Sequence, residues 1–468
     1  MPVEVITIDE YVWQDLSYLR WLHHDPDVTT LLALVGVQSH QFHRALDLAA
    51  YARHHGVRHC IVGGPHPMTC DTTALQGRGV SFAMAEAELI WHHILEDAVA
   101  GELQPVYGAD RRWAEQLPNL VINPPSQADL QRYGAPVLGL YPVRGCPYRC
   151  NFCSVIKISG RQVRNPDVES TLESLRRAKR AGVKIIKFVS DNFNKFPQVR
   201  ELLQAMIDEN IDLPFYCQCD SQIAKDPGLV ELLGRARCYE MFVGVESFNR
   251  KTLKAAGKYH NHPDHYSEII RLCNEAGIRP HFSNIIGFPE DDEAEIRHHL
   301  DVLKTLRPRI ASFYILTPIP GTEQYDEFRS AGRVIENNLD RYDGSCYTWE
   351  HPNLSQKTLV ELLYHCYVDY YGFLLKNGKL PEDDRGFALF CRYTAGLKRH
   401  PMAGGFDRIA VDNAAAYADL RRNTYDIDLA ALPDSLPLSA HDETLNRNAN
   451  WRMLRYRENT ALAGGHAQ

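Results

Sequence analysis

Three cysteines lie close together in the chain, at Cys146, Cys150 and Cys153, in a C-x3-C-x2-C pattern. With 12 cysteines in 468 residues, chance would produce such a triplet with an expected count on the order of 0.01. A structural zinc site normally uses four ligands, and no CxxC or HxxxH pair follows at a usual spacing. Three thiolates on one loop instead suit a [4Fe–4S] cluster in which one iron lacks a protein ligand. That open iron would be the reactive position.

The cysteine segment resembles the signature of radical S-adenosylmethionine (SAM) enzymes, in which an aromatic residue precedes the last cysteine. Phe152 occupies that position. The resemblance implies that the three cysteines bind the cluster and that SAM binds the open iron. An external electron donor such as flavodoxin or ferredoxin would then allow cleavage of SAM to a 5′-deoxyadenosyl radical. An iron–sulfur scaffold or sensor without enzymatic activity is the alternative.

Strand-like apolar runs alternate with helix-like stretches after the cysteine loop. Strands are expected at 183–190, 213–219, 239–246, 278–287 and 310–316, and helices at 167–181, 196–210, 227–237, 264–276 and 291–306. This alternation predicts a parallel α/β architecture. The resemblance sharpens the prediction to the partial (β/α)6 barrel of radical SAM enzymes. In parallel barrels, functional residues gather at the carboxyl ends of the strands.

Polar residues follow four of the expected strands, where the resemblance places cofactor contacts. Family members hold the methionine amino group of SAM after the strand that corresponds to 183–190, and a Gly-x-Pro stretch lies beside the adenine after the strand that corresponds to 278–287. The Gly-x-Glu-Ser stretch at the end of the strand 239–246 is found in many relatives that also bind cobalamin. The predicted cofactor-binding residues of the barrel are Phe152, Asp191, Asn192, Gln218, Glu246, Ser247, Asn284 and Gly287.

Residues 3–104 have the pattern of a separate α/β unit. Strands are expected at 3–8, 31–37, 57–62 and 80–84, with helices at 41–55 and from about 85 to 101. Glycines at the end of the third strand, Gly63 and Gly64, would let a backbone approach a ligand closely. By itself this pattern predicts half of a doubly wound, Rossmann-like nucleotide-type domain.

The same unit resembles the cobalamin-binding domain of B12-dependent radical SAM proteins, through its Gly-Gly-Pro-His-Pro stretch and a later Glu-x-Glu motif. The resemblance implies cobalamin contacts from Gly63, Gly64, His66 and Glu86. Three features depart from the family: its first strand and helix are absent, Ala85 replaces a glycine, and no Asp-x-His-x-x-Gly motif supplies a cobalt ligand. His66 therefore fits a turn residue better than a cobalt ligand. A scaffold or substrate lid without cobalamin is the alternative.

The expected organisation is a truncated cobalamin-binding-like domain (1–104), a proline-containing linker (105–135), a radical SAM core (136–335) and a mostly helical C-terminal extension (336–468). A helix is expected at 357–376, where five aromatic side chains favour core packing over a substrate cage. The motif Thr-Pro-Ile-Pro-Gly-Thr at 317–322 is expected to form a rigid turn.

Composition narrows the class of protein. The 51 Lys and Arg against 59 Asp and Glu give a formal charge of −8, which argues against a chain-wide nucleic-acid surface. No run approaches the roughly 18 apolar residues of a membrane span, and the N-terminus lacks signal-peptide features. A soluble, cytoplasmic protein is therefore expected.

These observations predict a radical SAM enzyme that acts on a small molecule or natural-product intermediate. If cobalamin binds, the resemblance implies methyl transfer to an unactivated carbon or phosphorus. If it does not, a radical rearrangement, cyclisation, epimerisation or oxidation is expected instead. One scaffold of this kind hosts many reactions, so this fold is compatible with many substrates.

Overall fold

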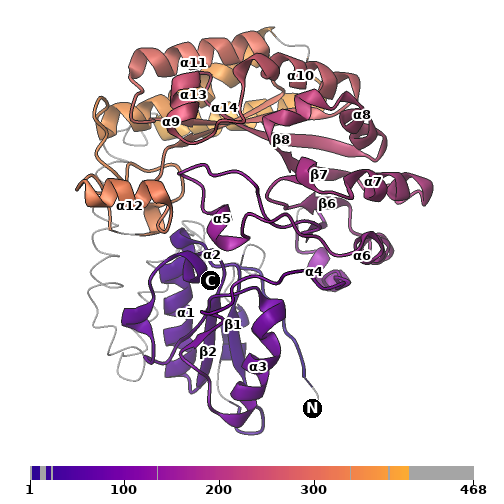
Figure 1. The fold of residues 1–468 in the computed structure, drawn as a ribbon, viewed down its shortest axis with the longest axis vertical. Helices are drawn as coiled ribbons and strands as arrows, with labels where there is room; N and C mark the ends of the chain where they lie inside the picture. The colour runs from indigo at the N-terminus through magenta and orange to yellow at the C-terminus, as the bar shows by residue number, and fades with distance from the viewer. Residues whose placement is uncertain are drawn as a thin grey trace, which may run out of the picture.

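The computed structural model describes residues 3–10, 17–22, 25–133, 135–337, 339–377 and 380–399. Two sheets of parallel strands form the two halves of the molecule (Figure 1). The first sheet has the order β1 (Leu31–Leu34), β2 (His59–Gly63), β3 (Ser81–Ala83), β4 (Val106–Tyr107). The second has the order β10-β9-β8-β7-β6-β5, so its strands also follow the chain.

The N-terminal sheet is accompanied by α1 (Phe42–His54), α2 (Pro65–Thr69) and α3 (Ala87–Ala100). Its core is apolar, with Val62 and Phe82 fully buried. The strand predicted at 3–8 is wrong, because residues 3–9 have no strand pairing and Val3, Val5 and Ile6 are exposed. Alternating apolar residues form a strand only where a sheet edge accepts their backbone hydrogen bonds.

The second sheet is an open barrel of six parallel strands. Its strands are β5 (Val137–Leu140), β6 (Ile185–Phe188), β7 (Phe215–Cys219), β8 (Cys238–Glu246), β9 (Arg279–Ile286) and β10 (Ile310–Ile315). Its helices are α5 (Val155–Ile158), α6 (Val168–Ala181), α7 (Val199–Asp208), α8 (Pro227–Arg235), α9 (Arg250–Ala255), α10 (Tyr266–Glu275) and α11 (Glu293–Leu306). The five strands and five helices predicted for this part of the sequence are confirmed, with small shifts at the ends, whereas β5, α5 and α9 were not among the predicted ranges.

Burial alternates along the barrel strands and defines an outer and an inner face. On β6, Ile186 and Phe188 are fully buried in the core whereas Lys187 between them is exposed. On β7, buried Phe215, Cys217 and Cys219 alternate with half-buried Tyr216 and Gln218. Because successive side chains of a strand point to opposite faces, the helices cover the outer face and the inner face stays partly open.

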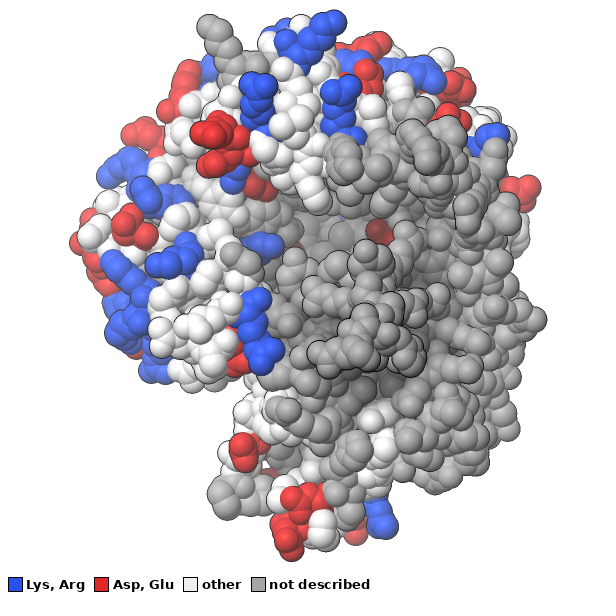
Figure 2. All heavy atoms as spheres, turned by 180° about the vertical axis from the view of Figure 1, so that it is seen from behind, with Lys and Arg blue, Asp and Glu red and all other residues white. Residues whose placement is uncertain are grey.

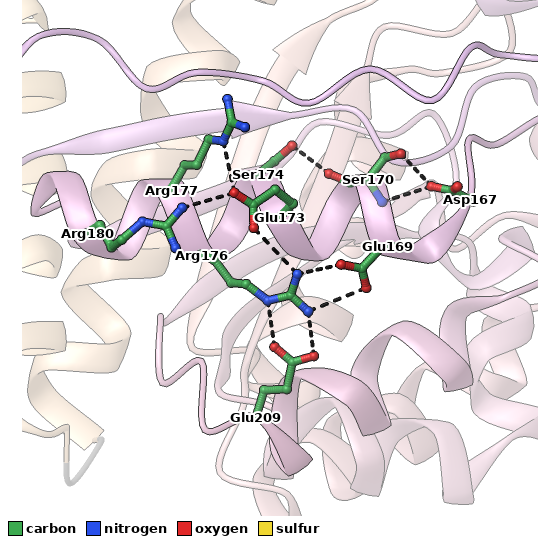
Figure 3. Close-up of polar contacts among 9 residues, drawn as sticks. All are labelled: Asp167, Glu169, Ser170, Glu173, Ser174, Arg176, Arg177, Arg180 and Glu209. Carbon is green, nitrogen blue, oxygen red and sulfur yellow. Dashed lines mark hydrogen bonds and ion pairs between the residues drawn. The ribbon is translucent and has the colours of Figure 1, made fainter.

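The exposed side of α6 carries a network of ion pairs. The helix begins after Asp167, whose side chain accepts a hydrogen bond of 2.8 Å from the Ser170 backbone N–H. Arg176 contacts Glu169 at 2.6 Å and Glu209 at 2.7 Å (Figure 3). On the face shown in Figure 2, basic side chains lie among acidic ones over the described surface. Exposed pairs of this kind contribute little to stability.

Three helices follow the barrel: α12 (Glu323–Ser330), α13 (Gln356–Asn377) and α14 (Glu382–Arg399). The helix predicted at 357–376 is confirmed, and its tyrosines pack on the barrel. Tyr371 donates to the Ala311 carbonyl (2.9 Å) and Tyr367 to the Phe313 carbonyl (3.2 Å). Residues 400–468 of the predicted extension lie outside the described residues. None of the helices described is long and apolar enough to cross a membrane.

The two halves meet at the carboxyl ends of their strands. The helix α2, which follows β2, contacts α5, which follows the cysteine loop after β5 (Figure 1). The turn at 317–322 also lies at the contact between the two halves, because an added Cβ on Gly321 would lie 2.5 Å from the Thr69 carbonyl oxygen. Within residues predicted as a linker, which also contain α4 (Gln127–Leu130), Trp113 donates to the Ile158 carbonyl at 2.8 Å.

Candidate cofactor site

The loop that carries the three cysteines follows β5 and contains a turn that only glycine can adopt. Gly145 has a φ of +97°, and an added Cβ would lie 2.2 Å from the Gln162 carbonyl oxygen. Its N–H donates to Asp191 at 2.8 Å, and the Cys146 N–H donates to the Gly160 carbonyl at 3.2 Å. Glycine is therefore required at position 145 for both conformation and space.

The second half of the loop packs against the end of α9. The Asn151 N–H donates to the Ala256 carbonyl at 3.1 Å, and an added Cβ on Gly257 would lie 2.6 Å from the Arg149 carbonyl oxygen. The Gln324 N–H at the start of α12 donates to the Asn151 carbonyl at 3.0 Å. Backbone contacts thus hold the loop from both sides.

The thiols of Cys146, Cys150 and Cys153 are partly exposed and lie near one another. Burial raises the pKa of Cys150 to about 12 and of Cys153 to about 11. The thiols are thus protonated without iron and lose their protons on binding it. In the described part of the chain, no three His, Cys, Asp or Glu residues converge on a single ion. The donor set fits a [4Fe–4S] cluster, in which each cysteine binds a different iron.

A buried ion pair lies beside the cysteines. Lys258 donates from Nζ to Glu246 Oε1 at 2.6 Å. Burial alone would lower the pKa of Lys258, but Glu246, Cys150 and Cys153 raise it above its usual value. The ammonium can therefore offset thiolate charge in the loop. Sequence reasoning missed Lys258, because no motif or spacing connects it to the cysteines.

Glu246 and Ser247 lie where β8 ends. Glu246 has a φ of +60°, a left-handed conformation that is costly for a residue with a side chain. The Ser247 Oγ accepts a hydrogen bond of 3.0 Å from the Asn249 N–H, which leads into α9. The predicted Gly-x-Glu-Ser stretch therefore connects β8 to the helix that supports the cysteine loop.

Asp191 contacts the cysteine loop through both carboxylate oxygens. Oδ2 accepts the hydrogen bond from Gly145, and Oδ1 accepts one of 2.6 Å from the Tyr141 hydroxyl. Burial raises the pKa of Asp191, and these two hydrogen bonds oppose that effect. The geometry gives Asp191 a role in positioning the loop, whereas its predicted contact with SAM stays a prediction.

Asn192 connects the end of β6 to the end of β7. Its Nδ2 donates to Asp220 Oδ2 at 2.7 Å, and its Oδ1 accepts from the Asp220 N–H at 3.1 Å. Burial raises the pKa of Cys146, and a hydrogen bond with Asn192 opposes that effect. Lys195 also contacts Asp220, at 3.4 Å. Asn192 thus lies beside the first cysteine, and its predicted cofactor contact stays a prediction.

Phe152 and Gly287 lie on two loops that meet. The ring of Phe152 contacts the edge of Phe288, with centroids 6.3 Å apart. Gly287 has a φ of +79°, and an added Cβ would lie 2.9 Å from the Leu359 side chain on α13. Asp291 Oδ2 accepts hydrogen bonds of 2.9 Å from the N–H groups of both Gly287 and Phe288. The loop after β9 is therefore held beside the cysteine loop.

Two further predicted residues lie within the barrel strands, Gln218 on β7 and Asn284 on β9. Gln218 is half-buried on the inner face of β7. Asn284 faces α11, where its Oδ1 pairs with His299 Nε2 at 2.9 Å and its Nδ2 donates to the Phe282 carbonyl at 2.9 Å. Because these contacts occupy the buried amide on the outer face of the barrel, the predicted cofactor contact of Asn284 does not fit the structure.

The glycine turn after β2 packs tightly against the N-terminal unit itself. Gly64 has a φ of +131°, and an added Cβ would lie 2.2 Å from the Val37 backbone nitrogen. An added Cβ on the adjacent Gly63 would lie 3.2 Å from the Ala83 side chain. The glycines therefore allow close contacts between the loops at the carboxyl edge of the sheet.

His66 is buried in this turn. Its Nδ1 pairs with Ser39 Oγ at 3.0 Å, and its ring stacks on Phe42 with centroids 4.0 Å apart. Burial, with a smaller effect from His43, lowers the pKa of His66 to about 3. The imidazole is therefore neutral, and its contacts fit a turn residue.

Glu86 is buried between the two halves of the molecule. Its carboxylate accepts hydrogen bonds from both terminal nitrogens of Arg164 (2.8 and 2.9 Å) and from the Ala114 N–H (2.8 Å). Arg144, at the start of the cysteine loop, contacts Glu86 at 3.3 Å and Glu88 at 2.6 Å. We call Glu86, Glu88, Arg144 and Arg164 the interdomain ion-pair cluster. These contacts occupy Glu86, so its predicted contact with cobalamin does not fit the structure.

The sequence between 140 and 303 matches the family profile of the radical SAM superfamily. One similar protein is the bacteriochlorophyllide d C-12(1)-methyltransferase of Chlorobaculum tepidum, 27% identical over 312 residues that cover 64% of this chain and 66% of the relative. The bacteriochlorophyllide d C-8(2)-methyltransferase of the same organism is 25% identical over 327 residues, or 66% of this chain and 71% of that protein. The chain thus spans about two thirds of the length of these relatives.

Solved structures share the fold over most of the chain. OxsB, a cobalamin-dependent SAM radical enzyme solved with aqua-cobalamin and SAM bound, matches with a TM-score of 0.62 and 14% identity over 98% of this chain and 76% of its own. TsrM, a radical SAM methyltransferase from Kitasatospora setae solved with cobalamin and a [4Fe–4S] cluster, matches with a TM-score of 0.59 and 15% identity. That match covers 80% of this chain and 84% of TsrM.

Proposed function

Because residues 140–303 match the radical SAM superfamily profile, we propose that the chain is a radical SAM enzyme that methylates a small molecule with the help of cobalamin. The observation that carries this proposal is the arrangement of the two parallel sheets. Their carboxyl ends face each other, and the cysteine loop lies where they meet. In α/β proteins, ligands bind outside the carboxyl ends of parallel strands.

Cys146, Cys150 and Cys153 would each supply a thiolate to a [4Fe–4S] cluster, which when bound provides the electron that cleaves SAM to the 5′-deoxyadenosyl radical. Asp191 holds the beginning of the loop through Gly145. The Lys258 ammonium lies close to two of the three thiols. Asn192, Gln218, Glu246, Phe152 and Gly287 are the residues we propose to surround SAM.

Cobalamin, when bound, would supply the methyl group from a position between the two sheets. The carboxyl edge of the N-terminal sheet offers apolar surface there: Val35, just after β1, is 78% exposed, and an added Cβ on Gly36 would meet no atom within 4 Å. Such a surface fits a flat macrocycle. The structural neighbours TsrM and OxsB were solved with cobalamin, and the Chlorobaculum relatives are methyltransferases.

We propose a soluble electron donor of the flavodoxin or ferredoxin type and a cytoplasmic location. All 12 cysteines are free, as expected in a reducing compartment. A small-molecule substrate is in keeping with a reaction that proceeds at the mouth of a barrel, where water must be excluded.

Radical chemistry without cobalamin, such as rearrangement or oxidation, is the second candidate. Two observations favour it: His66 is a buried, neutral turn residue, and Glu86 is occupied by the interdomain ion-pair cluster. Both residues belonged to the motifs that carried the predicted resemblance to cobalamin-binding domains. The N-terminal unit would then serve only to support the cysteine loop.

The test is anaerobic purification with iron reconstitution in the presence of cobalamin, followed by an absorption spectrum, corrinoid extraction and an assay for 5′-deoxyadenosine. We expect iron–sulfur absorption, stoichiometric corrinoid and 5′-deoxyadenosine. Replacing Cys146, Cys150 and Cys153 by alanine should abolish the iron–sulfur absorption, whereas Cys391→Ala, at a half-buried cysteine of α14, should not. Iron–sulfur absorption and 5′-deoxyadenosine without corrinoid would favour the second candidate.

A further inference from the structure

The inner face of the barrel is not filled by its own side chains. In closed (β/α)8 barrels, layers of large side chains pack the interior. Here Lys187 and Gly139 are exposed on that face, Val189 is 43% exposed just beyond β6, and Tyr314 of β10 is 38% exposed. The interior therefore has room for another molecule next to the strands.

On this face, Lys187 has no polar partner among the residues that the structure describes. Its neighbours in register are Gly139 on β5, which has no side chain, and Tyr216 on β7. Among the described residues, no hydrogen bond or ion pair involves the Lys187 ammonium. A lysine on a barrel interior that is left without a carboxylate is available to an anion from outside the chain.

The acidic groups of the inner face are already engaged. Glu240 on β8 accepts from His281 Nδ1 at 2.9 Å and contacts Arg279 at 3.6 Å. Asp384 of α14 pairs with both Arg279 and Arg309. These carboxylates therefore pair with other residues and not with Lys187.

Aromatic rings lie across the same face. The rings of Tyr216 and Phe242 are 6.3 Å apart, and Phe242 meets His281 edge-on at 4.8 Å. Burial is the main cause that raises the pKa of Tyr216, and Tyr314 is close enough to contribute. Binding sites for small molecules typically combine aromatic walls with a few polar groups that fix orientation.

We infer that the substrate is an aromatic or conjugated small molecule that carries an anionic group, such as a carboxylate. The anion pairs with Lys187, and the ring system lies against Tyr216, Phe242 and Tyr314. This inference rests on the proposed function, because it assumes that the substrate enters the barrel. Lys187 lies inside β6, whereas Asp191, which holds the cysteine loop, lies beyond the carboxyl end of that strand. The anion is therefore held away from the cysteine loop, and the opposite end of the substrate points toward it.

The experiment compares two probes that share a ring but differ in charge, indole-3-acetate and indole-3-acetamide. Their dissociation constants are measured by anaerobic equilibrium dialysis with the full-length, iron-reconstituted protein. We expect the anionic probe to bind at least about fivefold more tightly. Lys187→Met should abolish this preference and Lys187→Arg should retain it. Lys184→Met, at an exposed lysine just before β6, is the matched control and should change nothing.

Equal binding of the two probes, absence of binding by both, or an equal loss of preference in Lys184→Met would overturn the inference. The proposed function is tested separately by 5′-deoxyadenosine formation from SAM with a chemical one-electron reductant such as dithionite, in the absence of substrate. That activity should be the same in the unmodified protein and in the control variant Lys184→Met. If the unmodified protein forms no 5′-deoxyadenosine, the proposed function is contradicted, whether or not the probes bind.

Discussion

Replacing Glu86 by glutamine should loosen the attachment of the cysteine loop to the N-terminal unit. The carboxylate is 7% exposed and accepts hydrogen bonds from Arg164 through two nitrogens and from the Ala114 backbone. Glutamine keeps the shape of the side chain but loses its charge and turns one acceptor into a donor. That donor would face an N–H group of arginine or of the backbone.

The free-energy cost of Glu86→Gln depends on the hydrogen bonds that Arg164 and Arg144 retain. Removing one partner of a buried ion pair costs about 3–5 kcal/mol. Arg164 retains its hydrogen bonds to the Ala114 and Ser159 carbonyls, and Arg144 retains Glu88. We therefore expect the lower end of that range, about 3 kcal/mol.

The assay is native-state hydrogen exchange of the iron-free protein, followed in peptides that cover residues 141–166. Unfolding of a chain with two units need not be two-state, so a local opening free energy is preferable to a global one. A loss of about 3 kcal/mol corresponds to exchange that is about a hundredfold faster. The backbone pairing between Arg144 and Arg164, at 2.9 Å in both directions, lies inside this segment and should report the change.

The control is Glu169→Gln on the exposed side of α6. Glu169 also contacts an arginine, Arg176 at 2.6 Å, but its side chain is 68% exposed (Figure 3). Its replacement should cost about 0.2–1 kcal/mol. The reasoning is refuted if Glu86→Gln changes exchange in residues 141–166 by no more than Glu169→Gln does.

Three further changes test the site. Gly145→Ala should lower the iron content of the reconstituted protein severalfold, because its Cβ would lie 2.2 Å from the Gln162 carbonyl oxygen, whereas Gly228→Ala, with no atom nearer than 3.9 Å, should not. His66→Gln should leave the extracted corrinoid unchanged, since the imidazole contacts Ser39 and Phe42, and loss of more than half of the corrinoid would contradict this. Burial raises the pKa of Asp291 from 3.8 to about 7, so the folded protein binds its proton more tightly than the unfolded chain. The stability that this group contributes is complete below about pH 4 and is lost as the pH rises to about 7. Because asparagine does not titrate, thermal stability should depend less on pH across that interval in Asp291→Asn than in the unmodified protein.

Local sequence features predicted much of the fold and part of the site. The spacing of Cys146, Cys150 and Cys153 indicated a cluster loop, because ligands on one short segment need no tertiary information to be recognised. Apolar periodicity predicted the alternation of strands and helices in the barrel, because burial on one face leaves a repeating pattern in the chain. The strand predicted at 3–8 failed because a strand also needs a partner edge, which no local pattern supplies.

Tertiary structure alone decided which side chains meet. Glu86 and Arg164 are 78 residues apart, and no spacing rule connects them. Lys258 reaches the cysteines only because the chain after α9 returns to the cysteine loop. Asn284 follows the predicted pattern of polar residues near strand ends, yet it faces α11 because each strand sends alternate side chains to opposite faces. The sequence by itself thus determined the chemistry of the loop and the class of fold. The face, partner and charge balance of each polar residue depended on contacts between segments that only folding brings together.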